Sequence, residues 1–185
     1  EKRSGRDDAA VRPHIPDPYC CLTLLQYVGT RQSLSNPYTG VAAIFASRLM
    51  NGKAPIIFED GHQMRDFVSV HDIVKANLLV MERSSADGKA LNIGSGTAVT
   101  IQEVAAELGS ALDVTVPAEI SGKYRAGDIR HCFADISAAR EFLGYRPSVN
   151  LKAGIEELVS WIESQQAHDT VDQAMQVLTV HGLVA

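Results

Sequence analysis

Two arginines and one aspartate have the residue types that a phosphate-binding site requires. Arg65 stands just before Phe67, Val68 and Val70, a short apolar stretch that leads into a helix start, where partly positive backbone amides are expected. A guanidinium beside such amides suits an anionic ligand, above all a phosphate. The alternative is that Arg65 pairs with Asp66 or another surface carboxylate, an arrangement that contributes little to stability.

The second set is the loop sequence Arg125-Ala-Gly-Asp128. Arginine supplies a planar fork of donors that fits a phosphate, and aspartate supplies two acceptor oxygens that fit the hydroxyl groups of a ribose. The alternative is a salt bridge between residues i and i+3 in a surface loop, which is usually worth little. From these residues alone, both interpretations remain open.

A change of hydrophobic period within 61–81 predicts the element that would hold Arg65. Phe67, Val68 and Val70 are aromatic or β-branched, which favours a strand. From Val70 onward, six positions fall at i, i+3, i+4, i+7, i+8 and i+11, one face of a helix: Val70, Ile73, Val74, Asn77, Leu78 and Met81. His71 and Asp72 lie at the join, where aspartate is a good N-cap or first-turn residue.

The rest of the chain also contains both strand and helix patterns, which predicts an α/β fold. Extended segments are predicted at 20–28, 55–58, 90–93 and 114–120. Helices are predicted from 41 to about 51, from the capping box of Thr100 and Glu103, from Asp135 to Gly144, from Asn150, and near 171–178. Residues 1–18 are charged and proline-containing, and they are predicted to be loop or disordered.

Composition excludes several classes of protein. A chain of 185 residues can bury one sizeable core, and 45% apolar with 21% charged residues is ordinary for a globular protein. The formal charge of −5 argues against a nucleic-acid surface. Apolar runs fall well short of the ~18 residues of a membrane span, and the charged N-terminus is not a secretory signal. The three cysteines make no metal-ligand spacing with histidine. These features predict a cytoplasmic protein.

Four blocks in order resemble one known family: 31–40 (RQSLSNPYTG), 65–74 (RDFVSVHDIV), 91–96 (LNIGSG) and 124–131 (YRAGDIRH). They are similar to signatures of the extended short-chain dehydrogenase/reductases of the NAD-dependent nucleotide-sugar epimerase/dehydratase family, such as UDP-glucose and dTDP-rhamnose 4-epimerases. The similarity runs from about Gly29 to Ile162. Four blocks in the right order are far more specific than one.

This resemblance implies a fold and a division of the chain. The family has a Rossmann-type doubly wound sheet and a small mixed C-terminal lobe. The chain is expected to hold the C-terminal substrate-binding lobe and the last strands of the sheet, with the N-terminal cofactor half missing and apolar edges exposed. Residues 1–28 would be atypical, residues 29–165 would bind the nucleotide sugar, and residues 166–185 would form a helical tail.

The resemblance also implies roles for single residues. Arg125 and Asp128 match the family's residues that grip the diphosphate and the ribose, and Arg65 matches its other diphosphate arginine. Phe58 falls where an aromatic lies beside the base, although a plain core position is an alternative. Asn36 is a candidate for a polar loop contact. The implied partner is a nucleotide-diphosphate sugar, and the intact enzyme is expected to use NAD and to form a homodimer.

Catalytic residues of the family are not found in this sequence. No tyrosine is followed four residues later by lysine, and no Gly-x-x-Gly-x-x-Gly loop occurs. Gly94-Ser-Gly96 has Val99 at the third glycine position and is interpreted as structural. The predicted function is therefore the substrate-binding portion of a nucleotide-sugar 4-epimerase, inactive alone and not holding NAD. Alternatives are a nucleotide-sugar dehydratase, a non-catalytic nucleotide-sugar-binding remnant, and a helical interaction module.

The front edge of the resemblance suggests a displaced reading frame. The family reads approximately Leu-Arg-Tyr-Phe-Asn-(Val/Thr)-Tyr-Gly where this chain has LTLLQYVG at 22–29. Codons for 24–28 can encode Arg-Tyr-Phe-Asn-Thr in a neighbouring frame. The hypothesis is that residues before about Gly29 arise from such a frame, which puts in doubt Gln26, at the family's substrate-contacting asparagine.

Overall fold

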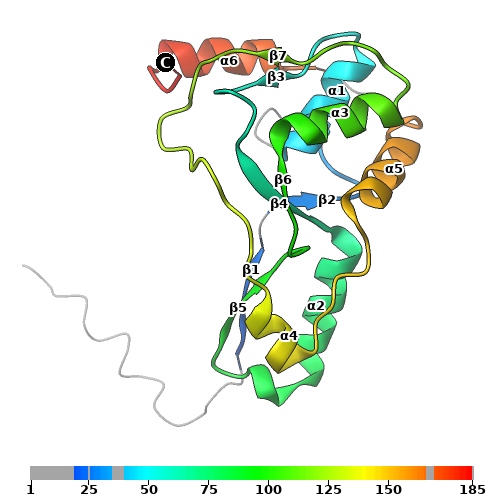
Figure 1. Cartoon of the computed structure of the whole chain (residues 1–185), viewed down its shortest axis with the longest axis vertical. Helices are drawn as coiled ribbons and strands as arrows, with labels where there is room; N and C mark the ends of the chain where they lie inside the picture. The colour runs from blue at the N-terminus through cyan, green and yellow to red at the C-terminus, as the bar shows by residue number, and fades with distance from the viewer. Residues whose placement is uncertain (1–18, 25, 35–39, 166–168, 185) are drawn as a thin grey trace, which may run out of the picture.

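The computed structural model describes residues 19–24, 26–34, 40–165 and 169–184, and it forms an elongated α/β fold (Figure 1). The strands are β1 (Cys21–Leu24), β2 (Gln26–Val28), β3 (Ile56–Ile57), β4 (Met64–Ser69), β5 (Ala90–Ile93), β6 (Ala98–Thr100) and β7 (Glu119–Ile120). The helices are α1 (Val41–Met50), α2 (Val70–Glu82), α3 (Ile101–Ala111), α4 (Ser137–Leu143), α5 (Leu151–Ile162) and α6 (Val171–Val180), with a 3-10 turn at Ser84–Ala86. The predictions for residues 1–18 and for Asn36 lie outside the described residues.

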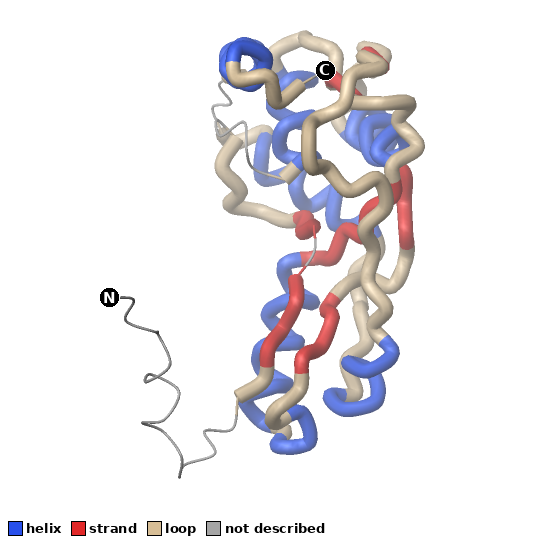
Figure 2. The backbone as a smooth tube through the Cα atoms, turned by 90° about the vertical axis from the view of Figure 1, so that its left-hand side faces the viewer, coloured by secondary structure: helices blue, strands red, loops and turns tan. Residues whose placement is uncertain are grey.

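Parallel pairing dominates the small sheets. β1 pairs with β5, β2 pairs with β4, and β3 pairs with β7, each in parallel, while β6 adds to β4 in the antiparallel sense. Figure 2 shows the paired strands β1 and β5 running beside α2 below the rest of the strands. The predicted single segment 20–28 thus contains two strands with different partners, because the chain passes from the lower sheet to the upper one.

Two hydrophobic clusters hold the two ends of the molecule. The upper cluster lies between α1, α3 and α5 and includes Phe45, Phe67, Leu108 and Leu158. The lower cluster joins α2, α4 and β5 around Tyr145, which is fully buried and donates a hydrogen bond from its hydroxyl to the Gly94 carbonyl at 2.9 Å. Burial raises the pKa of this phenol far above its ordinary value, with further contributions from Asp72 and Asp66.

The predicted change from strand to helix is confirmed, and of the two places expected for Asp72, N-cap or first turn, the residue takes the second. β4 runs directly into α2, and the N-cap is Ser69, whose hydroxyl accepts the His71 amide at 3.2 Å. Asp72 lies in the first turn and is 1% exposed. Its carboxylate accepts hydrogen bonds from the amides of Ser148 and Val149 and from the Ser148 hydroxyl. It therefore fixes the connection between α4 and α5.

The apolar stripe predicted on α2 does not face a core. Val74, Leu78 and Met81 are 52%, 54% and 82% exposed, and the buried positions of the helix are Asp72 and Ala76. The stripe shares one face, as its spacing predicts, but no described element covers that face. The exposure expected from the resemblance concerned the apolar edges of an incomplete sheet, whereas this exposed face belongs to a helix.

Several helix ends form as the sequence predicts. Thr100 and Glu103 form the capping box of α3, and Asn150 caps α5 by accepting the Ala153 amide at 2.9 Å. Gly144 ends α4 at φ 63°, a left-handed conformation that glycine adopts without strain. β6 was not predicted, and only two residues of the extended segment 114–120 form a strand. Within the described ranges, no helix is long and apolar enough to cross a membrane.

Candidate functional site

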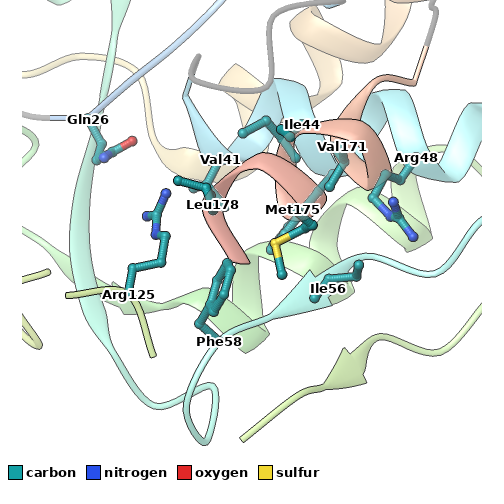
Figure 3. A pocket seen from close by; sticks show the side chains of 12 residues that line it. Gln26, Val41, Ile44, Arg48, Ile56, Phe58, Arg125, Val171, Met175 and Leu178 are labelled. Carbon is teal, nitrogen blue, oxygen red and sulfur yellow. The ribbon is translucent and has the colours of Figure 1, made fainter. Parts of the chain in front are cut away.

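Four of the predicted site residues line one cavity at the upper end of the molecule. Arg65, Arg125, Asp128 and Phe58 surround a space of about 190 Å³, with Gln63 and Glu59 also in its wall. We call this space the polar compartment. It continues into a second space of about 280 Å³, which we call the apolar compartment and which is shown in Figure 3. Both compartments share the following residues: Gln26, Val41, Phe45, Ile56, Phe58 and Arg125.

The loop after β7 brings the two arginines together. This loop passes down the outside of the fold from the top toward α4 (Figure 1). Near its end, the Cys132 amide donates to the Met64 carbonyl at 2.9 Å, and Cys132 forms a parallel bridge with Arg65. The Arg125–Asp128 segment therefore lies beside the strand that carries Arg65, although the two are far apart in sequence.

Arg65 is held by backbone carbonyl groups and not by a carboxylate. Its Nη1 donates to Met64 at 2.9 Å and Arg130 at 2.8 Å, and its Nη2 donates to Ile129 at 2.7 Å. The predicted alternative, a pair with Asp66, is absent within the described residues, because the Asp66 carboxylate is fully buried and binds the amides of 95–96. A guanidinium has five N–H donors, so Arg65 keeps donors for a ligand while its carbonyl partners fix its plane.

Arg125 and Asp128 do form the i,i+3 pair that was the alternative interpretation. Nε and Nη2 of Arg125 both contact Oδ2 of Asp128, at 2.9 Å and 2.8 Å. The two side chains are 43% and 37% exposed, so the pair contributes little stability. The guanidinium carbon also lies 5.2 Å from the centre of the Phe58 ring, a distance at which a cation and an aromatic face attract.

Phe58 is a wall of the cavity and not a core residue. Its neighbour Ile57 is fully buried in the upper cluster, whereas Phe58 is half-buried and borders both compartments. The alternation of strand side chains explains this difference, since adjacent residues of β3 and its continuation point to opposite sides.

Two glutamines complete the site, and Asn36 lies outside the described residues. Gln26, on β2 opposite Phe67, borders both compartments. Gln63 is 6% exposed and donates from its amide nitrogen to the Phe58 carbonyl. Its amide oxygen is buried without a partner within the described part of the chain. The sequence did not identify Gln63 as a site residue, because no local sequence pattern indicates that an acceptor will be buried without a partner.

An ion-pair cluster includes Glu59, which stands in the wall of the polar compartment. Arg130 pairs with Glu59 through Nη1 and with Asp60 through Nη2, the latter at 2.7 Å. The hydrogen bond from Arg130, followed by one from the His62 amide at 3.0 Å, lowers the pKa of Asp60 to about 2. The cluster ties the turn after β3 to the loop that holds Arg65.

Removing Arg130 should raise the pKa of Asp60. In Arg130→Ala, we expect that pKa to rise toward the ordinary value of about 3.9 but to stay below it, because the His62 amide still donates. A depressed pKa stabilises the fold at pH above the unfolded value, and this stabilisation is lost as the pH falls toward 2. Carboxyl carbon NMR titration measures the pKa directly. An unchanged Asp60 titration in the variant would contradict the assigned cause.

The turn 94–96 does not offer a phosphate site. The Ser95 amide donates to Oδ1 of Asp66 at 2.8 Å, and the Gly96 amide donates to Oδ2 at 3.1 Å. A buried carboxylate thus occupies the position that a diphosphate takes in a dinucleotide-binding turn. This turn, the part of the described chain that resembles a cofactor loop, does not fit NAD, and its structural interpretation is confirmed.

His71 and His131, which as histidines could act as bases near neutral pH, lie outside the cavity wall. Nε2 of His71 lies 2.9 Å from Oε1 of Glu157, and Nδ1 of His131 accepts the Met64 amide at 3.3 Å. No cluster of three or more metal-ligating side chains occurs in the described portion. The polar compartment presents two arginines, amide groups and an aromatic ring beside the carboxylates of Asp128 and Glu59. Its guanidinium groups can bind an anion, and its ring can pack against a planar group.

Comparison with known proteins agrees with this chemistry. Residues 14–94 match the family described as NAD dependent epimerase/dehydratase family. The chain is 34% identical over 148 residues to dTDP-L-rhamnose 4-epimerase of Burkholderia thailandensis, covering 80% of this chain and 40% of the relative. It is 32% identical over 126 residues to UDP-glucose 4-epimerase of Mycolicibacterium smegmatis, covering 68% and 40%.

Solved structures match over a similar share. UDP-N-acetylglucosamine 4-epimerase from Methanobrevibacter ruminantium M1, in complex with UDP-N-acetylmuramic acid, aligns with a TM-score of 0.74 and 31% identity over 80% of this chain and 47% of that one. UDP-glucose 4-epimerase from Thermotoga maritima, with UDP-glucose, aligns with a TM-score of 0.70 and 35% identity over 77% and 45%.

The family match bears on where the resemblance begins. It begins at residue 14, ahead of Gly29, where the similarity was expected to start. Gln26 lies inside this match and inside the cavity wall. The displaced-frame hypothesis for residues before about Gly29 stays a prediction. Together, the matches and the shared α/β architecture show that the chain, which spans 40–47% of these four relatives, belongs to the NAD dependent epimerase/dehydratase family.

Proposed function

We propose that the polar compartment binds the diphosphate of a nucleotide-diphosphate sugar, and that the chain is the substrate-binding portion of a nucleotide-sugar 4-epimerase. The observation that carries this proposal is the convergence of Arg65, Arg125, Asp128 and Phe58 on one cavity. Two structural relatives that share this fold are described with UDP-N-acetylmuramic acid and with UDP-glucose. Their ligands have the anionic and planar parts that this cavity can hold.

Each side chain has a distinct part in the proposed complex. The two guanidinium groups donate to the diphosphate oxygens, with charge-assisted hydrogen bonds that are stronger than neutral ones. Both contacts of Asp128 use Oδ2, which leaves Oδ1 for a ribose hydroxyl. Phe58 offers its ring to the base, and the buried oxygen of Gln63 can accept a hydrogen bond from the ligand.

We further propose that this chain binds the sugar nucleotide without converting it. Proton transfer at the sugar hydroxyl needs a positioned acid or base, and the sequence contains no Tyr-x-x-x-Lys pair. The same feature supports a second candidate, a protein that binds nucleotide sugars without catalysing a reaction. Both candidates predict binding, and they differ in whether a partner that supplies a Tyr-x-x-x-Lys pair restores turnover.

Replacing either arginine by alanine should weaken binding of UDP-glucose by roughly 10- to 150-fold. Each arginine contributes hydrogen bonds to a charged group, worth about 1.5–3 kcal/mol. Lysine at either position should rescue only part of the loss, because it lacks the planar fork. Asp128→Asn should cost less, since an amide oxygen still accepts a hydroxyl and Arg125 is freed from its ion pair. Calorimetric titration with UDP, dTDP and GDP sugars measures these affinities.

The matched control is Arg146→Ala, which removes an exposed arginine outside the cavity wall. Its affinity should equal that of the unchanged protein. Circular dichroism checks that Arg65→Ala, which releases two loop carbonyls, keeps its fold. Equal affinities in Arg65→Ala, Arg125→Ala and Arg146→Ala would refute the proposed diphosphate site.

A further inference from the structure

Helix α6 forms one wall of the apolar compartment. Val171, Ala174, Met175 and Leu178 line it, opposite Ile44 and Phe45 of α1 and next to Ile56 and Phe58. In Figure 3, α6 crosses the cavity, and Met175 extends from it toward the side formed by Phe58 and Ile56. The tail of the chain is therefore part of the same cavity as the proposed diphosphate site.

The beginning of α6 is anchored to α1 by a network of ion pairs. Nη1 of Arg48 contacts Asp172 at 2.8 Å and Asp169 at 3.4 Å, and Nζ of Lys53 contacts the same carboxylates at 2.8 Å and 2.9 Å. The side chains of Arg48 and Asp169 are only 7% and 2% exposed. Removing one partner of such a largely buried pair would leave the other charge uncompensated, which is strongly destabilising.

The end of α6 is attached to the opposite wall of the cavity. The Ala126 amide donates to the Leu183 carbonyl at 3.0 Å, and Arg125 forms an antiparallel bridge with Val184. The backbone that carries Arg125 is thus paired with the tail while its side chain faces the cavity. Contacts at both ends hold α6 across the apolar compartment, and one of them is made at a proposed ligand residue.

We propose that α6 is the specificity-determining wall for the base of the bound nucleotide, with Met175 and Leu178 packing against the base. This inference rests on the proposed function, since it assumes that the diphosphate lies in the polar compartment. Phe58 and Arg125 border both compartments, so a nucleotide with its diphosphate at the arginines extends its base into the apolar one. That compartment, of about 280 Å³, is close to the ~300 Å³ lower bound of ligand pockets, so it is large enough for a planar base.

The nature of the wall predicts how the base is recognised. Met175, Leu178 and Val171 carry no polar hydrogen-bonding groups apart from the weak thioether acceptor, so they contribute by burying area. This wall would then select between bases by ring size and not by edge hydrogen bonds, which only the polar side chains of the compartment, such as Gln26, can make. Methionine adapts its shape to a planar surface and packs well against aromatic rings.

The test compares UDP with inorganic diphosphate in titrations of the complete chain. In Met175→Ala and Leu178→Ala, we expect UDP to bind about 10-fold more weakly, because apolar contact area is lost. Binding of inorganic diphosphate should be unchanged, since it reaches only the arginines. Val180→Ala is the matched control: it lies on the same helix, is 82% exposed, and should alter neither affinity.

The outcomes separate this inference from the proposed function. If the unchanged protein binds neither UDP nor diphosphate, the proposed function itself fails. A second outcome is that the unchanged protein binds both UDP and diphosphate while the α6 variants leave UDP affinity unchanged or lower both affinities equally. In that case α6 does not contact the base. Tighter UDP binding in the variants would also overturn the inference, because it would mean that α6 occupies the place of the base.

Discussion

Replacing Asp72 by alanine is expected to lower the free energy of unfolding by about 3–4 kcal/mol, since a hydrogen bond to a charged group contributes about 1.5–3 kcal/mol. The carboxylate is 1% exposed. It accepts the Ser148 amide at 2.9 Å, the Ser148 hydroxyl at 2.7 Å and the Val149 amide at 3.1 Å. In the variant, these donors lose their acceptor and the start of α5 loses its anchor. Urea denaturation, followed by the fluorescence of Trp161 and by circular dichroism, measures the change.

Two further variants make this prediction sharper. Asp72→Asn keeps one acceptor oxygen, so it should lose about half as much stability. Glu82→Ala removes an exposed carboxylate from the other end of α2, and its effect should stay within about 0.5 kcal/mol. Similar losses in Asp72→Ala and Glu82→Ala would show that the three hydrogen bonds contribute little.

Gly94→Ala should cost about 3 kcal/mol, at the upper end of overpacking effects. A Cβ built on Gly94 would lie 2.3 Å from Oδ2 of Asp66 and 2.6 Å from the Cβ of Ala134. Asp66 cannot move aside without breaking its bonds to the Ser95 and Gly96 amides. Thermal unfolding monitored by circular dichroism measures the shift in midpoint.

A second glycine gives the matched control. Gly88 has φ 71° with no atom near its missing Cβ, so Gly88→Ala should cost only the ~1 kcal/mol of a left-handed alanine. Adding Ala134→Gly to Gly94→Ala relieves one of the two clashes and should recover part of the stability. If Gly94→Ala is no more harmful than Gly88→Ala, the close approach to Asp66 is not limiting.

Local signals in the sequence predict the elements that position the site. The change of period at Val70 marks the join of β4 and α2, because strands and helices place their apolar residues at different spacings. Thr100 with Glu103, Asn150 and Gly144 mark helix ends because their side chains or backbone satisfy the orphan groups there. Such features depend on a few neighbouring residues and are visible in one sequence.

Long-range contacts could not be predicted in the same way. The spacing on α2 shows that Val74, Leu78 and Met81 share a face, but it does not show what covers that face. The burial of Asp72 depends on amides of 148–149, far along the chain. A charged side chain in a first turn is ordinarily expected at the surface, so its burial follows only from the tertiary partners.

The candidate site was also only partly predictable from the sequence. Arg65, Arg125, Asp128 and Phe58 were selected from their chemistry and from the family resemblance, and the structure brings all four to one cavity. The carbonyls of Ile129 and Arg130 occupy some of the N–H donors of Arg65. Which donors remain free depends on the path of the loop after β7, and local sequence patterns do not determine that path. The packing of α6 against the cavity was not predicted, because the apolar stripe of an amphipathic helix does not identify the surface that it covers.

The separation of the two hydrophobic clusters has a consequence for motion. Phe67 of β4 belongs to the upper cluster and Ala76 of α2 to the lower one, and no loop separates the two elements. The two clusters are thus joined by one continuous strand and helix, and separate clusters of this kind can differ in their free energy of local opening. A ligand in the upper cavity would stabilise the upper cluster by mass action, and the effect on the lower cluster would have to pass through β4, α2 and the Asp72 bonds.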